Sequence, residues 1–154
     1  MKKGTAILAF TSAVVAAGAI GGSFNPGDPD TRRWYDALDK PPFNPPDAVF
    51  PIVWTTLYAL MVVSAYRVWR GGHHTRALTL WALQLVFNAI WNPLFFGAKQ
   101  PAIAMADLLA LLAALAAYTR AAARTDRPAA ALMIPYLAWV AFAGAINFEI
   151  VRRN

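Results

Sequence analysis

The chain of 154 residues contains no cysteine, which excludes both a disulfide framework and a thiolate metal site. Charged residues are also scarce. They make up 14% of the chain, whereas a typical soluble domain has roughly 25%. Hydrophobic residues, by contrast, make up 58% of the chain. This composition indicates a membrane protein, and the length leaves room for one domain.

A net charge of +6 would ordinarily suggest a nucleic acid as partner. In this chain, however, most basic residues stand at the ends of apolar runs, as the cations of membrane proteins do. These residues are Lys2, Lys3, Arg67, Arg70, Arg76, Arg120, Arg124, Arg127, Arg152 and Arg153. No basic stripe remains for a phosphate backbone, and we therefore exclude nucleic acid as a partner.

Five apolar segments are long enough to cross a bilayer, which takes about 20 helical residues. They cover residues 4–24, 48–69, 77–98, 102–119 and 129–151. We therefore predict an all-α fold, in which residues 1–154 form one integral membrane bundle of five transmembrane helices. Five spans put the termini on opposite faces. A small excess of Lys and Arg on the N-terminal side favours an N-terminus inside. The sequence leaves open which membrane holds the protein.

The first apolar segment has two interpretations. Lys2 and Lys3 precede it as in a signal peptide, and Ala17-Gly18-Ala19 resembles a signal-peptidase site, so the segment could be cleaved. Alternatively, it is retained as a membrane helix. Gly18 and Gly22 have the GxxxG spacing that allows two helices to pack closely.

Residues 25–46 connect the first two apolar segments and are rich in proline. The pairs Pro41-Pro42 and Pro45-Pro46 rule out a continuous helix or a central strand, because proline fixes φ and lacks a backbone donor. A stiff, partly extended segment of this kind loses little conformational entropy when it closes over a ligand. We predict that residues 25–46 form a lid.

Polar and aromatic residues inside the spans are candidates for function, because a polar group in lipid needs a partner or a cavity. Gln84, Asn88 and Asn92 form a stripe on the third span. At about 1.5 Å per residue, Asn88 lies at a depth below the lid similar to that of several residues of other spans. Those at a similar or slightly greater depth are Trp54, Tyr58, Trp91, Trp139 and Ala143.

These residues predict one aromatic cavity in the half of the bundle nearest the lid. Flat rings and a few amide groups suit a large, planar, mostly apolar ligand. The alternative stays open that the tryptophans serve only as packing or interface anchors. The amide stripe would then serve only to join helices.

No catalytic constellation, phosphate-binding loop or metal-ligand spacing is present. His73 and His74 lie in a glycine turn away from the lid, where we expect a solvated turn rather than a metal site. We expect Asp107 to pair with a cation from the lid and Glu149 to pair with Arg152. We predict no metal site and no required cofactor, and a bound haem would lack a cysteine or an in-pocket histidine as axial ligand.

Four motifs follow one another along the chain. They are WYDALDKPPFNPP, FPIVWTTLY, FNAIWNPLFFG and IPYLAWVAFAGAINFEIVRRN, and together they extend from Trp34 to Asn154. This order resembles the tryptophan-rich sensory protein / translocator protein family (TspO, the peripheral-type benzodiazepine receptor). The resemblance implies a five-helix membrane protein, usually a homodimer, that retains its first helix.

The resemblance also implies a ligand class. Members bind porphyrins such as protoporphyrin IX and haem, benzodiazepine-type compounds and cholesterol. By motif position, the implied pocket comprises Tyr35, Trp54, Tyr58, Asn88, Trp91, Trp139 and Ala143. We therefore expect a binding protein that senses or moves tetrapyrroles. The alternative is an enzyme that degrades porphyrin in light, in which Trp54 and Trp139 would be the catalytic residues.

The sterol motif of the family pairs a tyrosine with a basic residue at the end of the last helix. Here Phe148 stands at the tyrosine position, and Arg152 is the cation. The missing hydroxyl removes one partner for a sterol 3-OH group, which argues against cholesterol as the natural ligand.

Overall fold

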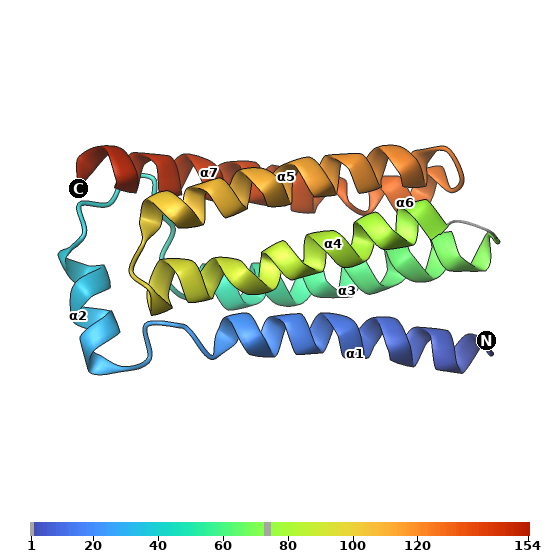
Figure 1. Ribbon diagram of the computed structural model, residues 1–154, viewed down its shortest axis with the longest axis horizontal. Coiled ribbons are helices and arrows are strands. Elements are labelled where there is room, and N and C mark those ends of the chain that lie inside the picture. Colours follow the sequence, from blue (N-terminus) through green and yellow to red (C-terminus); the bar gives the residue numbers. More distant parts are fainter. Residues whose placement is uncertain (1, 73–74) are drawn as a thin grey trace.

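The computed structural model describes residues 2–72 and 75–154, which form a bundle of long helices (Figure 1). Five stretches are long and apolar enough to span a membrane. They are α1 (Lys3–Gly22), α3 (Val49–Arg70), α4 (Thr75–Asn92) with its continuation η1 (Pro93–Gly97), α5 (Pro101–Ala123), and α6 (Arg127–Ala131) with α7 (Ile134–Arg153). No strand occurs among the described residues, and the all-α prediction is confirmed.

Two ranges differ from those expected. α5 continues to Ala123 rather than ending near residue 119, because Arg120 and the alanines after it are good helix formers. The last span begins with the short helix α6, which a turn at Leu132 and Met133 separates from α7. The turn expected at His73 and His74 lies outside the described residues.

The segment between α1 and α3 contains a helix that the proline pattern did not predict. α2 (Pro29–Ala37) is capped at its N-terminus by Asp28. The Asp28 carboxylate accepts hydrogen bonds from the backbone N–H groups of Asp30 and Thr31 at 3.1 and 2.9 Å. Hydrogen bonds from the side chain and backbone of Thr31 hold the pKa of Asp28 below its usual value. The lid is therefore helical in its first half, and only its proline-rich second half is extended.

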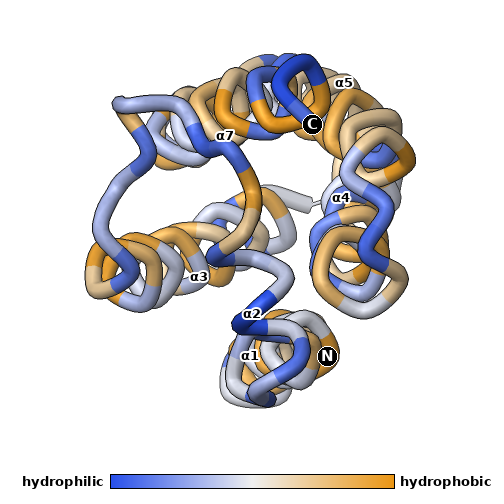
Figure 2. Tube along the Cα trace, turned by 90° about the vertical axis from the view of Figure 1, so that its left-hand side faces the viewer, coloured by the Kyte–Doolittle hydropathy of each residue, from blue (hydrophilic) through white to orange (hydrophobic). Residues whose placement is uncertain are grey.

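The helices form a ring when the bundle is viewed from the end that carries α2 (Figure 2). α1 packs against α3 and α4, α4 packs against α5, and α5 packs against α7, whereas α3 meets α6 at the far end. α2 and its flanking segments lie across the near end of the bundle (Figure 1). We call this the lid end.

Aromatic rings attach α2 to the bundle. Pro93 cannot donate a backbone hydrogen bond, and the helix widens after it into the π-turn η1, in which the Ala98 N–H donates to the Pro93 carbonyl at 2.7 Å. The widened turn carries Phe95 and Phe96. Their ring centroids lie 6.4 and 5.5 Å from that of Tyr35 on α2.

In the far half of the bundle, a buried hydroxyl joins three helices. Ser64 on α3 donates to the carbonyl of Ala129 on α6 at 2.8 Å, and its oxygen lies 2.7 Å from the hydroxyl of Tyr118 on α5. Arg67 and Asp126 form an ion pair at 3.1 Å beside this cluster. The polar groups of these five residues are therefore satisfied within the protein, as an apolar surrounding requires.

Two glycines bring α1 close to its neighbours. A Cβ atom at Gly18 would lie only 2.8 Å from the Tyr58 ring on α3. A Cβ atom at Gly21 would lie 3.3 Å from the amide nitrogen of Asn92 on α4, which donates to the Gly21 carbonyl. Gly22 has nothing within 4 Å of such an atom. The close packing of α1 thus depends on Gly18 and Gly21 rather than on the GxxxG pair.

We expect Gly18→Ala to lower the thermal midpoint of unfolding in detergent, because the added methyl group must displace the Tyr58 ring. Overpacking of this kind typically costs about 1–3 kcal/mol. Gly22→Ala is the matched control. It adds the same methyl group in open space and favours the helix, so its midpoint should stay the same or rise. Circular dichroism melts of the two variants give the test, and equal midpoints would contradict the close contact at Gly18.

Candidate functional site

A cavity of about 570 Å³ lies inside the lid end of the bundle. Ligand pockets commonly measure roughly 300–1,000 Å³, so the cavity can hold a sizeable small molecule. Its cover comes from the segment between α1 and α3, through Asn25, Pro26, Gly27, Arg32, Tyr35, Asn44 and Asp47. Its walls come from α1, α3, α4, η1, α5 and α7.

Aromatic rings dominate these walls and hold one another in place. The Trp54 ring centroid on α3 lies 5.5 Å from that of Tyr58 and 6.0 Å from that of Tyr136 on α7. Trp139 on α7 meets Phe50 on α3 edge to face at 5.8 Å. Such packed rings present flat apolar faces in fixed orientations, which favours stacking against a planar ligand.

A hydrogen-bonded chain links three helices at the cavity. The Tyr58 hydroxyl donates to the Asn88 side-chain oxygen at 3.3 Å, and the Asn88 side-chain nitrogen donates to the Tyr136 hydroxyl at 2.9 Å. Tyr136 is fully buried and Asn88 is nearly so. The Asn88 amide thus fixes both tyrosines and leaves them little freedom to move when the cavity fills.

Of the eight ligand-binding residues expected from the sequence, seven line this one cavity: Tyr35, Trp54, Tyr58, Asn88, Trp91, Trp139 and Ala143. Gln84 does not. It shares a helix face with Asn88 but lies one turn farther from the lid, where its side chain is fully buried. Its amide has no partner among the described residues. A ligand-binding role for Gln84 stays a prediction, and the lining of this cavity does not include it.

The two residues of the sterol motif lie outside the cavity. The Phe148 side chain is 54% exposed on the outer side of α7. Arg152 pairs with Glu149 at 2.7 Å, as expected from their spacing, and Glu149 also binds Arg153 at 3.0 Å. The expected partner of Asp107 is not found, because its buried side-chain oxygen has no hydrogen-bond partner among the described residues.

Several residues of the cavity were not predicted from the sequence. Arg32 and Asp47 form an ion pair at 2.8 Å at its lid side, and Phe95 and Phe96 contribute rings from η1. Tyr136 is not among the lining residues, but it supports the wall by accepting a hydrogen bond from Asn88, and it was also not predicted. The burial pattern of α7 follows Tyr136, Val140, Gly144 and Asn147, together with Ile146 and Ile150. The sequence did contain a signal for Tyr136, because a tyrosine inside an apolar span needs a hydrogen-bond partner there.

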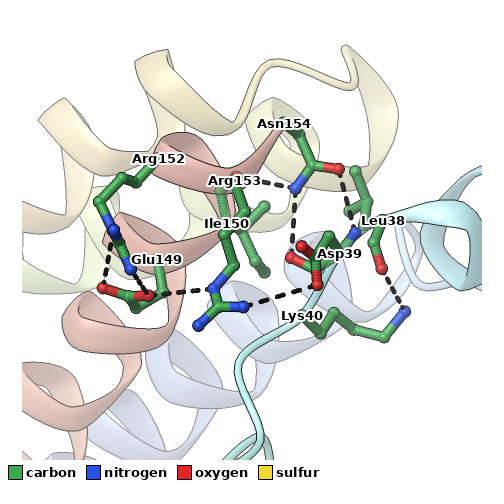
Figure 3. A network of polar contacts seen from close by, with 8 residues as sticks. All are labelled: Leu38, Asp39, Lys40, Glu149, Ile150, Arg152, Arg153 and Asn154. Carbon is green, nitrogen blue, oxygen red and sulfur yellow. Dashed lines mark hydrogen bonds and ion pairs between the residues drawn. The ribbon is translucent and has the colours of Figure 1, made fainter.

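The end of α7 binds the lid backbone (Figure 3). The Asp39 N–H donates to the Asn154 side-chain oxygen at 3.0 Å, and the Asn154 side-chain nitrogen donates to the Asp39 carbonyl at 3.2 Å. Arg153 adds an ion pair with the Asp39 carboxylate at 3.7 Å. We call these contacts the α7 latch. It holds the lid where α2 gives way to the extended segment.

Lys40 stabilises the lid from the other side of this junction. Its ammonium group donates to the carbonyls of Tyr35 and Leu38 at 2.5 and 3.4 Å and lies 4.5 Å from the centre of the Tyr35 ring. Carbonyls at a helix C-terminus attract cations, which explains this position. Burial raises the pKa of the Tyr35 hydroxyl above its usual value.

The fold and cavity define a class: a multi-pass membrane protein of five apolar helices with an aromatic-lined cavity at one end. The chain belongs to the TspO/MBR family, whose sequence pattern matches residues 10–153. It is 40% identical to a tryptophan-rich sensory protein of Cereibacter sphaeroides over 147 residues, which cover 96% of this chain and 90% of that protein.

Animal relatives are about as similar. A translocator protein of Homo sapiens is 40% identical over 152 residues, which cover 96% of this chain and 89% of that protein. One of Bos taurus is 39% identical over 150 residues, which cover 94% and 88%. Family membership together with the five apolar helices supports a multi-pass membrane protein with a sensory or binding role.

We expect Asn154→Ala to increase hydrogen–deuterium exchange at the Asp39 amide and in the extended half of the lid. The substitution removes both hydrogen bonds between the side chain and the lid backbone. A net loss of about 1 kcal/mol corresponds to roughly fivefold faster exchange. Arg152→Gln is the control, because Arg152 binds Glu149 and, among the described residues, makes no hydrogen bond or ion pair with the lid. Equal protection in all three proteins would show that the α7 latch does not hold the lid.

Proposed function

We propose that the cavity binds a planar, mostly apolar tetrapyrrole and that the protein senses or carries this ligand. The observation that carries the proposal is the meeting of Trp54, Trp91 and Trp139 with two tyrosines around one covered cavity. Flat rings at fixed positions favour a rigid macrocycle over a flexible chain, because neither partner loses much freedom on binding. Benzodiazepine-type compounds, which are also compact and apolar, are a second class suited to the same cavity.

A metal-free porphyrin fits the lining better than haem. None of the described residues that line the cavity is a histidine or a methionine, and the chain has no cysteine. These are the usual axial ligands of haem iron, so only tyrosine hydroxyls would be available to it. Trp91 and Asn147 each keep one buried polar atom without a partner among the described residues.

Arg32 offers a contact for acidic groups of the ligand. It lines the cavity at the lid side and donates one hydrogen bond to Asp47. A guanidinium group has five N–H donors, so further donors remain for a carboxylate. The apolar face of a porphyrin would then stack in the bundle, while its propionates would point to the lid.

We expect Arg32→Gln to weaken the binding of protoporphyrin by roughly three- to tenfold, the size typical of one partly exposed charged contact. Binding of protoporphyrin dimethyl ester should not change, because the ester has no carboxylate. Arg33→Gln is the control on the same helix, since Arg33 pairs with Asp30 and does not line the cavity.

Titration of each purified protein in detergent, followed by tryptophan quenching, measures the affinities of the wild type and both variants for protoporphyrin and for its dimethyl ester. If Arg32→Gln weakens the acid and the ester equally, the propionates do not meet Arg32. If neither compound shows saturable binding to the wild-type protein, the tetrapyrrole proposal is wrong.

We also propose the remaining features implied by the family. The protein would form a homodimer within the membrane, with its N-terminus inside. The orientation is supported by the end opposite the lid, which holds eight Lys and Arg residues and one acidic residue, Asp126. Any sterol contact would involve Phe148 and Arg152 on the lipid-facing side of α7 rather than the cavity.

Light-driven porphyrin degradation is the alternative function, because Trp54 and Trp139 line the same cavity from different helices. An oxidisable indole beside the macrocycle is the feature that such chemistry would require. Phenylalanine keeps a stacking ring, so Trp54→Phe or Trp139→Phe should cost about 1 kcal/mol or less in affinity. Trp69→Phe is the control, because Trp69 packs on Tyr66 and does not line the cavity.

If the protein only binds porphyrin, we expect the Soret band of bound protoporphyrin to bleach at the same rate in the wild type and in all three variants. The measurement is absorbance under constant illumination at saturating protein. If bleaching stops in Trp54→Phe and Trp139→Phe but persists in Trp69→Phe, the protein is an enzyme and the binding proposal is incomplete.

A further inference from the structure

Positive charge is concentrated at the end of the bundle opposite the lid. That end carries eight of the fourteen Lys and Arg residues of the chain and one of its eight acidic residues. The lid end and its connecting segments carry six Lys and Arg residues and six acidic residues, so their charges balance. The two ends of one membrane protein therefore present very different electrostatic surfaces to the two leaflets.

A groove of about 300 Å³ lies at the basic end, between the start of α4 and the end of α5. Arg76 lines it from α4, Arg120 from the last turn of α5, and Arg124 from the position just after that helix. These two helix ends lie far from α2 (Figure 1). Three guanidinium groups thus meet at the level where a transmembrane helix leaves the hydrocarbon region.

The arginines of this groove differ from most others in the chain. Arg32, Arg33, Arg67, Arg152 and Arg153 each have a carboxylate within 4 Å. Within residues 2–72 and 75–154, no ion pair is found for the three arginines of the groove. Like charges gathered around one groove repel one another, and an anion placed among them would relieve that repulsion.

Apart from Thr125, the remaining lining residues of the groove are apolar. Beside the arginines, the groove is lined by apolar residues of the two membrane spans: Ala77 and Leu80 from α4, and Ala117 and Ala121 from α5. Ala117 is exposed on the outer surface of α5. A ligand in this groove would therefore meet cations at one end and a smooth hydrocarbon-facing surface at the other.

We propose that this groove binds the phosphate headgroup of an anionic phospholipid from the leaflet opposite the lid. The guanidinium groups would hold the phosphate oxygens in bidentate fashion, and an acyl chain would lie along the alanine surface of α5. The apolar wall favours a lipid over free phosphate, because an inorganic ion gains nothing from that surface. The site is separate from the tetrapyrrole cavity and does not depend on that proposal.

The test compares two double variants with the same loss of charge. Arg120→Gln/Arg124→Gln removes two cations from the groove. Arg70→Gln/Arg127→Gln removes two from the same end without touching the groove lining. Native mass spectrometry of the full chain in detergent measures the retention of phosphatidylglycerol and of phosphatidylcholine with identical acyl chains.

We expect the wild-type protein to retain phosphatidylglycerol in preference to phosphatidylcholine. The groove variant should lose about tenfold in phosphatidylglycerol affinity, whereas the control should stay within about twofold of the wild type. Arg76→Gln changes the groove from α4 alone, and it should weaken retention severalfold, which keeps the test valid if the double variant does not fold.

Three results would overturn the proposal. If both double variants lose phosphatidylglycerol equally, the attraction is a diffuse property of the basic end. If the wild-type protein retains both lipids equally, the groove does not select anionic headgroups. If inorganic phosphate binds the groove as tightly as the lipid does, the groove is a site for a free anion and the apolar wall contributes nothing.

Discussion

The side-chain amide of Asn88 is the contact on which the cavity depends most. It binds hydroxyl groups from two other helices, Tyr58 on α3 and Tyr136 on α7. In an apolar surrounding each of these groups would be costly to leave unpaired, so the three helices are held at one mutual spacing. The rings of Trp54 and Trp139 then extend from helices whose positions are already fixed, and the cavity between them does not collapse.

The two halves of the bundle satisfy their polar groups in different ways. In the far half, Ser64 and Tyr118 bind each other at close range within a packed core. In the lid half, the aromatic walls surround free volume, and the closing contacts join the lid to the ends of the spans. The α7 latch and the rings of η1 supply these contacts. The lid half therefore depends on contacts made by the lid, whereas the far half does not.

Much of this site could be predicted from the sequence, because the spacing of four residues fixes a helix face and the rise per residue fixes depth. Those two rules brought Trp54, Asn88 and Trp139 to one cavity. The same rules did not separate Gln84 from the lining residues, because the helix face that carries Asn88 continues beyond the end of the cavity. They also could not show α2, whose start depends on the local cap at Asp28. The Arg32–Asp47 ion pair joins residues fifteen positions apart in a segment without periodicity.

The lid carries its own order, and this has a consequence for how a ligand would move. Pro41, Pro42, Pro45 and Pro46 restrict the extended half, and Asn154 and Lys40 hold the junction with α2. A cover that is ordered before binding costs little entropy when the cavity fills, which favours tight binding. The same order slows access, because the α7 latch must open before a rigid macrocycle can pass. Exchange of the ligand would then be limited by lid opening, and the contacts of Asp39 with α7 would set its rate.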